Sequence, residues 1–401
     1  MQPEARQLRS ENTRAGNRAV LFLAQLPPPH HGQSAVAATV KGILERDAGL
    51  DVVQKWRGGA ASNNDVGKRS LGKYFGFLAL LLDLAFMLVS GRRFRLAYLG
   101  MAPWAHTAIR DALLAGMARL LADRVWLHVH GDGLEAILTG TGRKAALMRF
   151  LLRGTELIAI TADTGRLGRR SGLFSHVIDL PNIAADPGAR ATAPHSPLTV
   201  GCLGNLDPRK GVLDFVDAIG RLENSGIPVA ATMVGGPTAQ LSVEDLKARV
   251  AERGLSDSIT VTGRVTEDDK SRILGGLDVF LYLSRHDLAP LALIEGLAHG
   301  AAPIVLDVGG LAEMVGPRLA GNVLDPALTG TALLDEIETI FAAYKADPAL
   351  LERDKAAART QYLKEFSPDR YRNRVLKELS WDPTQPAFPP TPAPSIGEVR
   401  P

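Results

Sequence analysis

The sequence of 401 residues contains a single cysteine, and this scarcity excludes several kinds of protein. One cysteine, Cys202, allows neither an internal disulfide framework nor a zinc site built from four cysteines. It stands in an apolar stretch, where we expect it to be buried as a small hydrophobic residue. Aromatic residues are also scarce, at 5%, and no nucleic-acid-binding motif is present. A nucleic-acid partner is therefore not expected.

The sequence also lacks an apolar leader and a long uninterrupted apolar run. Residues 1–17 are polar and charged, so we expect no secretory signal there and a cytoplasmic location. The longest apolar run, residues 75–89, contains Asp83 and is shorter than the ~20 residues of a spanning helix. The net charge of +3 is a mild basic excess, which suits an anionic small molecule or a membrane surface.

The order of predicted elements indicates two α/β domains. A chain of this length exceeds one ordinary hydrophobic core. Apolar runs typical of buried strands alternate with helical segments from residue 19 to residue 180, and the same alternation restarts at residue 198. This pattern predicts two doubly wound, Rossmann-like domains with parallel sheets that face a ligand cleft.

The domain limits follow from changes in composition along the chain. Residues 184–197 are rich in Ala and Pro, as a linker would be, and the last 20 residues are rich in Pro. We expect a disordered tail at 1–17, a first domain at 18–185, a linker at 186–197, a second domain at 198–365, a C-terminal helix at 366–381 and a disordered tail at 382–401.

Basic residues flank the apolar helix predicted at residues 74–89. Lys68, Arg69 and Lys73 precede it, and Arg92, Arg93 and Arg95 follow it. One interpretation is a core helix with solvated ends. The other is a helix that docks on an anionic membrane through residues 68–95, because each basic residue near such a surface contributes about 1 kcal/mol.

Two histidines end the strand predicted at residues 125–130. His128 and His130 share one face of that strand, and Asp132 follows them in a His-x-His-x-Asp pattern. A binuclear metal site of this type would need a further histidine at position 133, where Gly133 stands. We therefore expect no metal, and histidines that are hydrogen-bonded or face a substrate at the strand's carboxyl end.

The most informative stretch is residues 281–315. It contains the end of one apolar strand, a polar turn that ends in Asp287, a helix at 290–299 that carries Glu295, and a second apolar strand at 302–306 followed by Gly309 and Gly310. Alone, the two acids fit a helix N-cap and a surface charge equally well. Other polar and glycine-rich segments follow neighbouring strands, which favours a binding site at this edge.

These segments together resemble family 4 of the retaining, nucleotide-sugar-dependent glycosyltransferases, which have the two-domain GT-B fold. The resemblance extends from about residue 20 to residue 379 and is strongest from 200 to 315. It is carried by Pro303 and by the segments 204–211 (GNLDPRKG), 234–237 (VGGP), 262–265 (TGRV), 284–295 (SRHDLAPLALIE) and 309–313 (GGLAE).

The resemblance implies that a nucleoside-diphosphate sugar binds the second domain and a glycan or lipid-linked acceptor binds the first. The C-terminal helix would cross back to the first domain. No cofactor or metal is implied, because Lys210, helped by Arg209 and a helix dipole, would stabilise the departing diphosphate. Asp287 would hold sugar hydroxyls, Glu295 the ribose, and His130 would face the reacting centre.

The remaining donor-binding positions implied by the resemblance are glycines and loop residues that border the same site. In the first domain, Gly32 lies in a strand-to-helix loop of the kind that approaches an anion. The full set is Gly32, Gly204, Gly235, Gly236, Arg264, Leu288, Ala289, Leu291, Gly309 and Gly310.

The sequence departs from the family at three positions that bear on activity. Asp287 replaces the usual Glu, Leu288 the usual Gly, and Asn205 a frequent Arg. A catalytically weakened, glycan-binding or scaffold protein is therefore one alternative to a hexosyltransferase. A sugar epimerase or phosphorylase on the same fold is another.

Overall fold

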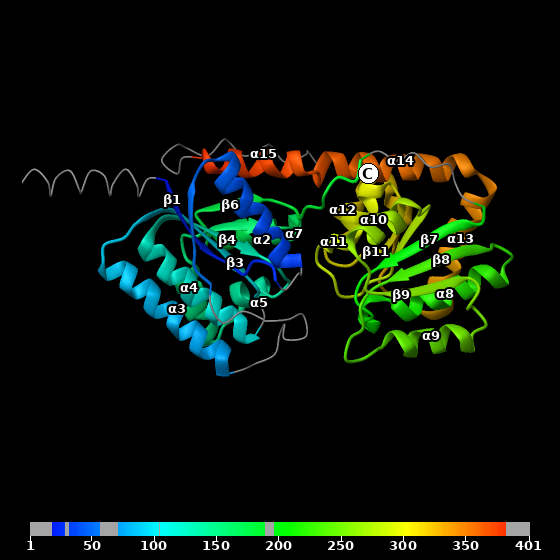
Figure 1. The fold of residues 1–401 in the computed structure, drawn as a ribbon, viewed down its shortest axis with the longest axis horizontal. Coiled ribbons are helices and arrows are strands. Elements are labelled where there is room, and N and C mark those ends of the chain that lie inside the picture. The colour runs from blue at the N-terminus through cyan, green and yellow to red at the C-terminus, as the bar shows by residue number, and fades with distance from the viewer. Residues whose placement is uncertain (1–17, 29–31, 57–70, 104, 189–195, 382–401) are drawn as a thin grey trace, which may run out of the picture.

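The computed structural model describes residues 18–28, 32–56, 71–103, 105–188 and 196–381. It contains two parallel α/β domains side by side, joined along one edge by a long helical segment (Figure 1). The expected fold class is confirmed. The tails expected at 1–17 and 382–401, and much of the expected linker, lie outside the described residues.

The first domain is built on a parallel sheet of order β2-β1-β3-β4-β5-β6. Its strands are apolar on both faces, which is typical of a sheet covered by helices on each side. They are β1 (Ala19–Leu23), β2 (Asp51–Gln54), β3 (Phe94–Met101), β4 (Ala122–Val129), β5 (Glu156–Ala159) and β6 (His176–Asp179).

Alternate side chains of these strands enter two separate cores. Leu21, Leu99 and Leu127 pack toward α3 (Leu71–Val89), α4 (Ala105–Leu121), α5 (Leu134–Thr139) and α6 (Arg143–Leu152). Phe22 and Tyr98 face the other way, toward α2 (Gly32–Gly42) and the π-helical turn Ile43–Asp47. Helix α7 (Ala162–Ser171) lies between β5 and β6 in the sequence.

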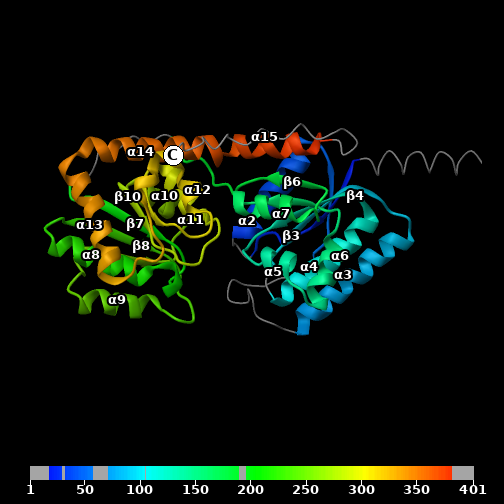
Figure 2. The same cartoon turned by 180° about the vertical axis from the view of Figure 1, so that it is seen from behind.

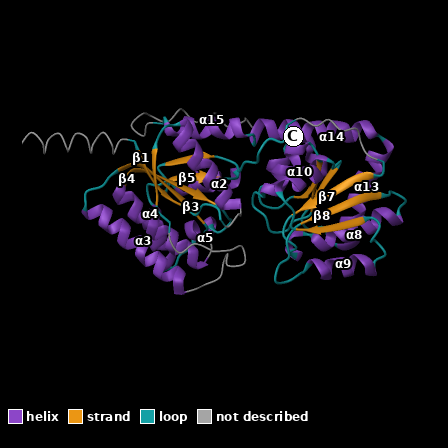
Figure 3. Ribbon diagram, viewed as in Figure 1, coloured by secondary structure: helices purple, strands orange, loops and turns teal. Residues whose placement is uncertain are grey.

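The second domain repeats the design with the order β12-β11-β10-β7-β8-β9. Its strands are β7 (Leu198–Leu203), β8 (Val229–Val234), β9 (Ile259–Gly263), β10 (Val279–Tyr282), β11 (Ala302–Leu306) and β12 (Val323–Leu324). Its helices are α8 (Val212–Asn224), α9 (Val243–Glu252), α10 (Glu267–Gly275), α11 (Leu291–His299), α12 (Leu311–Val315) and α13 (Gly330–Ala346). Helices cover both faces of each sheet (Figure 3). Cys202 is buried in β7, as expected.

Helices α14 (Pro348–Glu365) and α15 (Pro368–Leu379) run along one side of both domains, as the view from behind also shows (Figure 2). The start of α15 has Pro368 in its first turn, where a missing N–H costs nothing. Tyr371, Val375 and Leu379 enter the first domain's core. The predicted crossing of the C-terminal helix is therefore confirmed.

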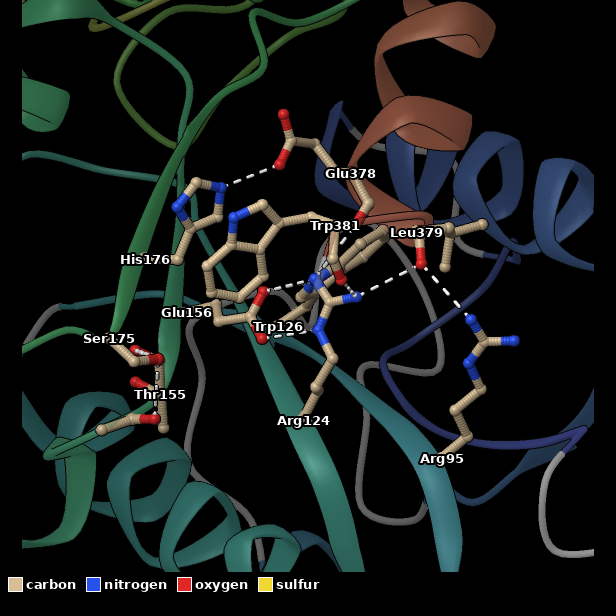
Figure 4. Close-up of polar contacts among 11 residues, drawn as sticks. Arg95, Arg124, Trp126, Thr155, Glu156, Ser175, His176, Glu378, Leu379 and Trp381 are labelled. Carbon is tan, nitrogen blue, oxygen red and sulfur yellow. Dashed lines mark hydrogen bonds and ion pairs between the residues drawn. The ribbon is translucent and has the colours of Figure 1, made fainter. Parts of the chain in front are cut away.

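A polar cluster anchors the end of α15 to the first sheet (Figure 4). Arg124 on β4 forms two 2.7 Å hydrogen bonds to the carboxylate of Glu156 on β5. The same guanidinium donates to the carbonyl oxygens of Glu378, Leu379 and Trp381 at the end of α15. The last carbonyls of a helix lack full helical partners, so the part-buried arginine acts as a C-terminal cap of α15.

The structure corrects two expectations for the first domain. Helix α3 begins at Leu71 and has 19 residues, so by length and composition alone it could cross a membrane, which the shorter predicted run could not. The interpretation of this segment as a core helix is also wrong for most of α3, because only 17% of its most apolar 18-residue segment is buried inside the protein. Helices α5 and α6 were not predicted; Gly140 and Gly142 interrupt the apolar period between them.

Candidate functional site

Five neighbouring strands of the second sheet bring the candidate donor residues to one edge. Gly204 follows β7, Gly235 and Gly236 follow β8, Asp287 follows β10, and Gly309 and Gly310 follow β11. Arg264 follows β9 at the edge of the sheet. All these strands are parallel, so their carboxyl ends meet at the same edge, where ligands bind in open α/β sheets.

Close backbone packing explains two of the glycines. A Cβ atom on Gly235 would lie 1.7 Å from the carbonyl oxygen of Gly204, so no side chain fits between these loops. Gly309 has a φ of +57°, and a Cβ atom there would lie 2.3 Å from the carbonyl oxygen of Asp287. Glycine at these positions lets the loops after β7 and β8 approach each other, and likewise the loops after β10 and β11.

Lys210 and Asp287 form the charged centre of this edge. The Lys210 Nζ atom lies 2.7 Å and 2.9 Å from the two carboxylate oxygens of Asp287. The hydroxyls of Tyr282 and Ser284 each donate to Asp287 Oδ2 over 2.6 Å. Three of these four contacts fall on Oδ2, which is saturated, and only one falls on Oδ1. Asp287 therefore holds Lys210 in place, and Oδ1 keeps one acceptor position for a ligand hydroxyl.

The surroundings keep Asp287 ionised. Burial acts to raise its pKa, but the Lys210 charge and the hydrogen bonds from Lys210, Ser284 and Tyr282 outweigh burial, and the pKa is lowered. Burial, together with the Asp287 charge, raises the pKa of Tyr282 well above its ordinary value, so the phenol stays protonated and donates. The network is thus a stable array of one cation, one anion and two neutral donors near neutral pH.

Backbone N–H groups stand beside this charged centre. Helix α11 begins at Leu291 without a side-chain cap, and its N-cap is Pro290 rather than Asp287. Within the described part of the chain, no acceptor lies within hydrogen-bond reach of the N–H groups of Leu288, Ala289 and Leu291. Such N–H groups and the positive end of the helix dipole favour an anion.

Contacts from two directions fix the loop that carries these N–H groups. The N–H of Gly310 donates to the carbonyl of Leu288 over 2.8 Å. From the first domain, the side-chain amide of Asn182 donates to the carbonyl of Ala289 over 2.8 Å. Both carbonyl groups are therefore hydrogen-bonded, one to the second domain and one to the first, and these bonds hold the loop in place.

Glu295 lies one turn inside α11 and is paired with Lys270 on α10. The Lys270 Nζ atom lies 2.9 Å from Glu295 Oε1 and 2.8 Å from Glu267 Oε2. Burial raises the pKa of Glu295, although the Lys270 charge opposes that shift. The Glu295 side chain is 21% exposed, so it remains within reach of a ligand's hydroxyls.

The two candidate arginines lie at the rim of this edge. The Arg209 side chain is 59% exposed and pairs with Asp207 over 2.7 Å. Arg264 is also exposed, and its guanidinium lies against Gly236, where a Cβ atom would come within 2.5 Å of Arg264 Nε. Neither arginine takes part in the Lys210–Asp287 network.

The first domain brings its own strand and helix ends toward the same region. A Cβ atom on Gly32, at the start of α2, would lie 3.7 Å from Leu291 at the start of α11. The two helix N-termini therefore face each other across the domain junction (Figure 1). Such an arrangement can enclose an anionic ligand from two sides.

The paired histidines on β4 have different surroundings. The rings of His128 and His130 lie 4.1 Å apart, which confirms that they share a face. His128 is fully buried, its Nδ1 atom lies 2.8 Å from the Tyr98 hydroxyl, and burial lowers its pKa well below the ordinary value. His130 follows at the strand's end and is only partly buried. His128 is therefore a neutral core residue, and His130 is the one of the pair that remains a site candidate.

Two further contacts join the domains next to the Gly309–Gly310 turn. Glu313 Oε2 accepts a 2.8 Å hydrogen bond from the N–H of Ala162, in the first turn of α7. A Cβ atom on Gly310 would lie 2.6 Å from Cγ2 of Thr161. A cavity of about 560 Å³ opens beside them, between Thr161, Glu313 and the charged face of α15, and Lys210, Asp287 and Glu295 do not line it.

Sequence reasoning missed the residues that support the site. Lys270, Tyr282, Ser284 and Asn182 had no assigned role, although each contacts a predicted site residue or its loop. Ser284 lies within the recognised segment 284–295, and Asn182 lies just after the last apolar run of the first domain, so both offered a weak signal. No pattern marked Lys270, because its pairing with Glu295 depends on how α10 packs on α11.

The second half of the chain is similar to a known protein family. Residues 189–359 match the model of the family "Glycosyl transferases group 1". The match covers the strand-end edge that carries Lys210, Asp287 and Glu295.

The curated proteins that are similar to this chain include transferases for different sugars. A lipopolysaccharide core biosynthesis mannosyltransferase, LpcC of Rhizobium leguminosarum bv. viciae, is 32% identical over 222 residues, or 52% of this chain and 59% of that protein. A 2-deoxystreptamine glucosyltransferase of Streptomyces kanamyceticus is 28% identical over 218 residues, or 49% and 55%. The chain thus spans between half and three-fifths of the length of these relatives.

Solved structures resemble the whole two-domain chain. Sucrose-phosphate synthase from Thermosynechococcus elongatus matches with a TM-score of 0.65 at 17% identity, over 90% of this chain and 98% of that one. Anabaena HepE, solved in complex with UDP-glucose, matches with a TM-score of 0.61 at 16% identity, over 90% and 99%. At these identities the likeness establishes the two-domain fold.

Proposed function

We propose that the chain is a retaining glycosyltransferase of the hexosyltransferase type. It would move a sugar from a nucleoside-diphosphate sugar to a glycan or lipid-linked acceptor, in the synthesis of a cell-surface polysaccharide or glycolipid in the cytoplasm. The observation that carries the proposal is the Lys210 ammonium, held by Asp287 at the edge where the N–H groups of 288–291 gather. The family match of residues 189–359 supports it.

The first requirement of the reaction is charge stabilisation on the departing diphosphate. When the bond between the sugar's anomeric carbon and the phosphate oxygen breaks, negative charge grows on that oxygen. Lys210 uses two of its three N–H donors on Asp287 and keeps one for the phosphate. The α11 dipole and the N–H groups of Leu288 and Ala289 add to this stabilisation, so we propose that no metal ion is needed.

The second requirement is transfer to the face that the diphosphate leaves. No side chain is assigned as a nucleophile, so we propose front-face transfer. The acceptor oxygen bonds to the anomeric carbon, its proton passes to the leaving phosphate oxygen, and the anomeric configuration is retained. Gly32 and His130 in the first domain would border the acceptor, and Glu295 would accept hydrogen bonds from the ribose hydroxyls.

The test is release of nucleoside diphosphate from a panel of nucleotide sugars by the full chain. We expect release from at least one donor, retained anomeric configuration in the product by NMR, and activity that survives EDTA. Glu295→Gln removes the negative charge and should lower release at least a hundredfold. Glu252→Gln, an exposed acid on α9, is the matched control and should leave release unchanged. Equal release by Glu295→Gln and the control would refute the site.

One observation favours a second candidate, a nucleotide-binding protein without turnover. Asp287 already binds Lys210, Tyr282 and Ser284, and only its Oδ1 atom keeps an acceptor position for a sugar hydroxyl. This candidate predicts that the chain binds a nucleoside diphosphate but releases none from any nucleotide sugar, with or without Glu295.

A further inference from the structure

Helix α3 (Leu71–Val89) is apolar around its whole circumference, although only one side of it is covered. At about 100° per residue, its seven exposed apolar side chains lie within about 120° of one another around the helix axis. Each is at least 53% exposed, and they are Leu71, Tyr74, Phe75, Leu78, Leu82, Phe86 and Val89. We call these seven residues the α3 stripe.

The opposite side of α3 is the side that packs on the first domain. Leu80, Leu84 and Met87 are buried in the core that α3 shares with α4, and they point about 180° away from the α3 stripe. The two charged residues of the helix, Lys73 and Asp83, also lie off the stripe, and Asp83 is paired with Lys55. A helix that is apolar all round is normally covered all round, so the stripe requires a partner.

Helices of the same domain also carry exposed apolar side chains. Helix α4 contributes the exposed Leu113 and Leu120, and α6 contributes Leu147 and Phe150. Both views place α3 on the outside of the first domain, on the side of the molecule opposite α14 and α15 (Figures 1 and 2). A partner bound to α3 would therefore contact neither the second domain nor the helices α14 and α15.

Basic residues border the end of the stripe. Arg92 and Arg93 follow α3 and are exposed, whereas Arg95 points to the other side of the sheet and donates to the carbonyl of Leu379 at the end of α15. Arg93 donates to the carbonyl of Leu120 on α4, so its charge lies between the two apolar helices. An apolar face with two arginines at its end is complementary to an anionic lipid surface.

We propose that the α3 stripe docks the first domain on an anionic membrane, with α3 lying in the plane of the interface. Strands β2 and β3, which precede and follow α3, belong to the same sheet, so both ends of the helix return to one domain. Crossing the membrane would pull Leu80, Leu84 and Met87 out of their core. The helix has 19 residues, which at 1.5 Å each makes the stripe about 28 Å long. Along this length, seven apolar side chains can insert into the surface of the lipid layer.

The test is flotation of the full chain with vesicles, without any nucleotide or sugar, so that its result does not depend on the proposed transferase activity. Wild-type protein should bind vesicles of 30% phosphatidylglycerol in phosphatidylcholine and bind pure phosphatidylcholine at least tenfold less. Phe75→Ser/Leu82→Ser/Phe86→Ser should lower binding to the anionic vesicles at least tenfold. Leu363→Ser, at an exposed leucine on α14, is the apolar control and should bind as wild type.

The basic rim has its own pair of variants. Arg92→Gln/Arg93→Gln should lower binding to anionic vesicles and weaken its dependence on salt, because fewer charges face the lipid. Lys247→Gln/Arg249→Gln on α9 removes two exposed charges from the second domain and should have no effect. Circular dichroism and thermal unfolding show whether each variant is folded.

Two results would overturn the proposal. One is a folded stripe variant that floats with the vesicles as wild type does. The other is wild-type protein that stays with the soluble fraction at every lipid composition. If in that case it sediments as a dimer and the stripe variant as a monomer, the stripe's partner is a second copy of the chain.

Discussion

Replacing Lys210 with methionine separates the stability of the site from its activity. The change leaves the Asp287 carboxylate, whose side chain is 15% exposed, without its counter-charge. Removing one partner of a fully buried ion pair costs about 3–5 kcal/mol. Lys210 is 27% exposed, so we expect a smaller loss of about 2–3 kcal/mol. For a domain of this size that lowers Tm by about 5–10 °C.

The companion variant, Lys210→Met/Asp287→Asn, removes both charges. An asparagine side chain accepts from the Tyr282 hydroxyl without needing a cation, so the double variant should regain most of the lost stability and none of the activity. Urea unfolding and nucleotide release, measured on the two single variants and the double variant, give the coupling free energy. A Lys210→Met protein as stable as wild type, or an active double variant, would refute the reasoning.

Three other predictions follow from the described contacts. Tyr282→Phe removes a hydrogen bond that lowers the pKa of Asp287, so the pKa of this carboxyl should rise. As the pH is lowered, both activity and stability should then begin to decline at a higher pH than in the wild type, and an unshifted pH–activity profile would contradict this. Gly309→Ala places a Cβ 2.3 Å from a carbonyl at positive φ and should lower Tm by several degrees, whereas Gly321→Ala, with open space around it, should not. Arg124→Met removes the counter-charge of the buried Glu156 and the cap at the end of α15. We expect the free energy of unfolding to fall by about 3–5 kcal/mol and proteolysis at that end to become faster, and an unchanged cleavage rate would count against the anchor.

The fold could be predicted from the sequence because parallel strands covered on both faces are continuous apolar runs. The run predicted at 302–306 is β11, and α15 (Pro368–Leu379) lies within the C-terminal helix predicted at 366–381. The carboxyl-edge location of Lys210 and Asp287 followed from the same strands, since parallel strands end together. The domain limits and the roles of the site residues remain predictions.

The finer arrangement depended on side-chain length and packing, which no periodicity contains. Asp287 is one methylene shorter than the usual Glu, and in the structure it contacts Lys210, Tyr282 and Ser284. The pairing of Glu295 with Lys270 depends on the packing of α10 against α11. Helix α3 was ambiguous for a related reason: apolar composition cannot distinguish a covered side from an uncovered one.

The central claim is that Lys210 and the start of α11 form a nucleotide-sugar site, and thermal shift with nucleoside diphosphates tests it most directly. A ligand at 100 times its Kd stabilises the folded state by about 2.7 kcal/mol, which corresponds to a rise of about 5–10 °C in Tm. We predict such a rise for wild-type protein with at least one of UDP, GDP, ADP and dTDP, and its near-complete loss in folded Lys210→Met. A wild-type Tm unmoved by all four nucleotides, or an equal rise in the variant, would contradict the claim.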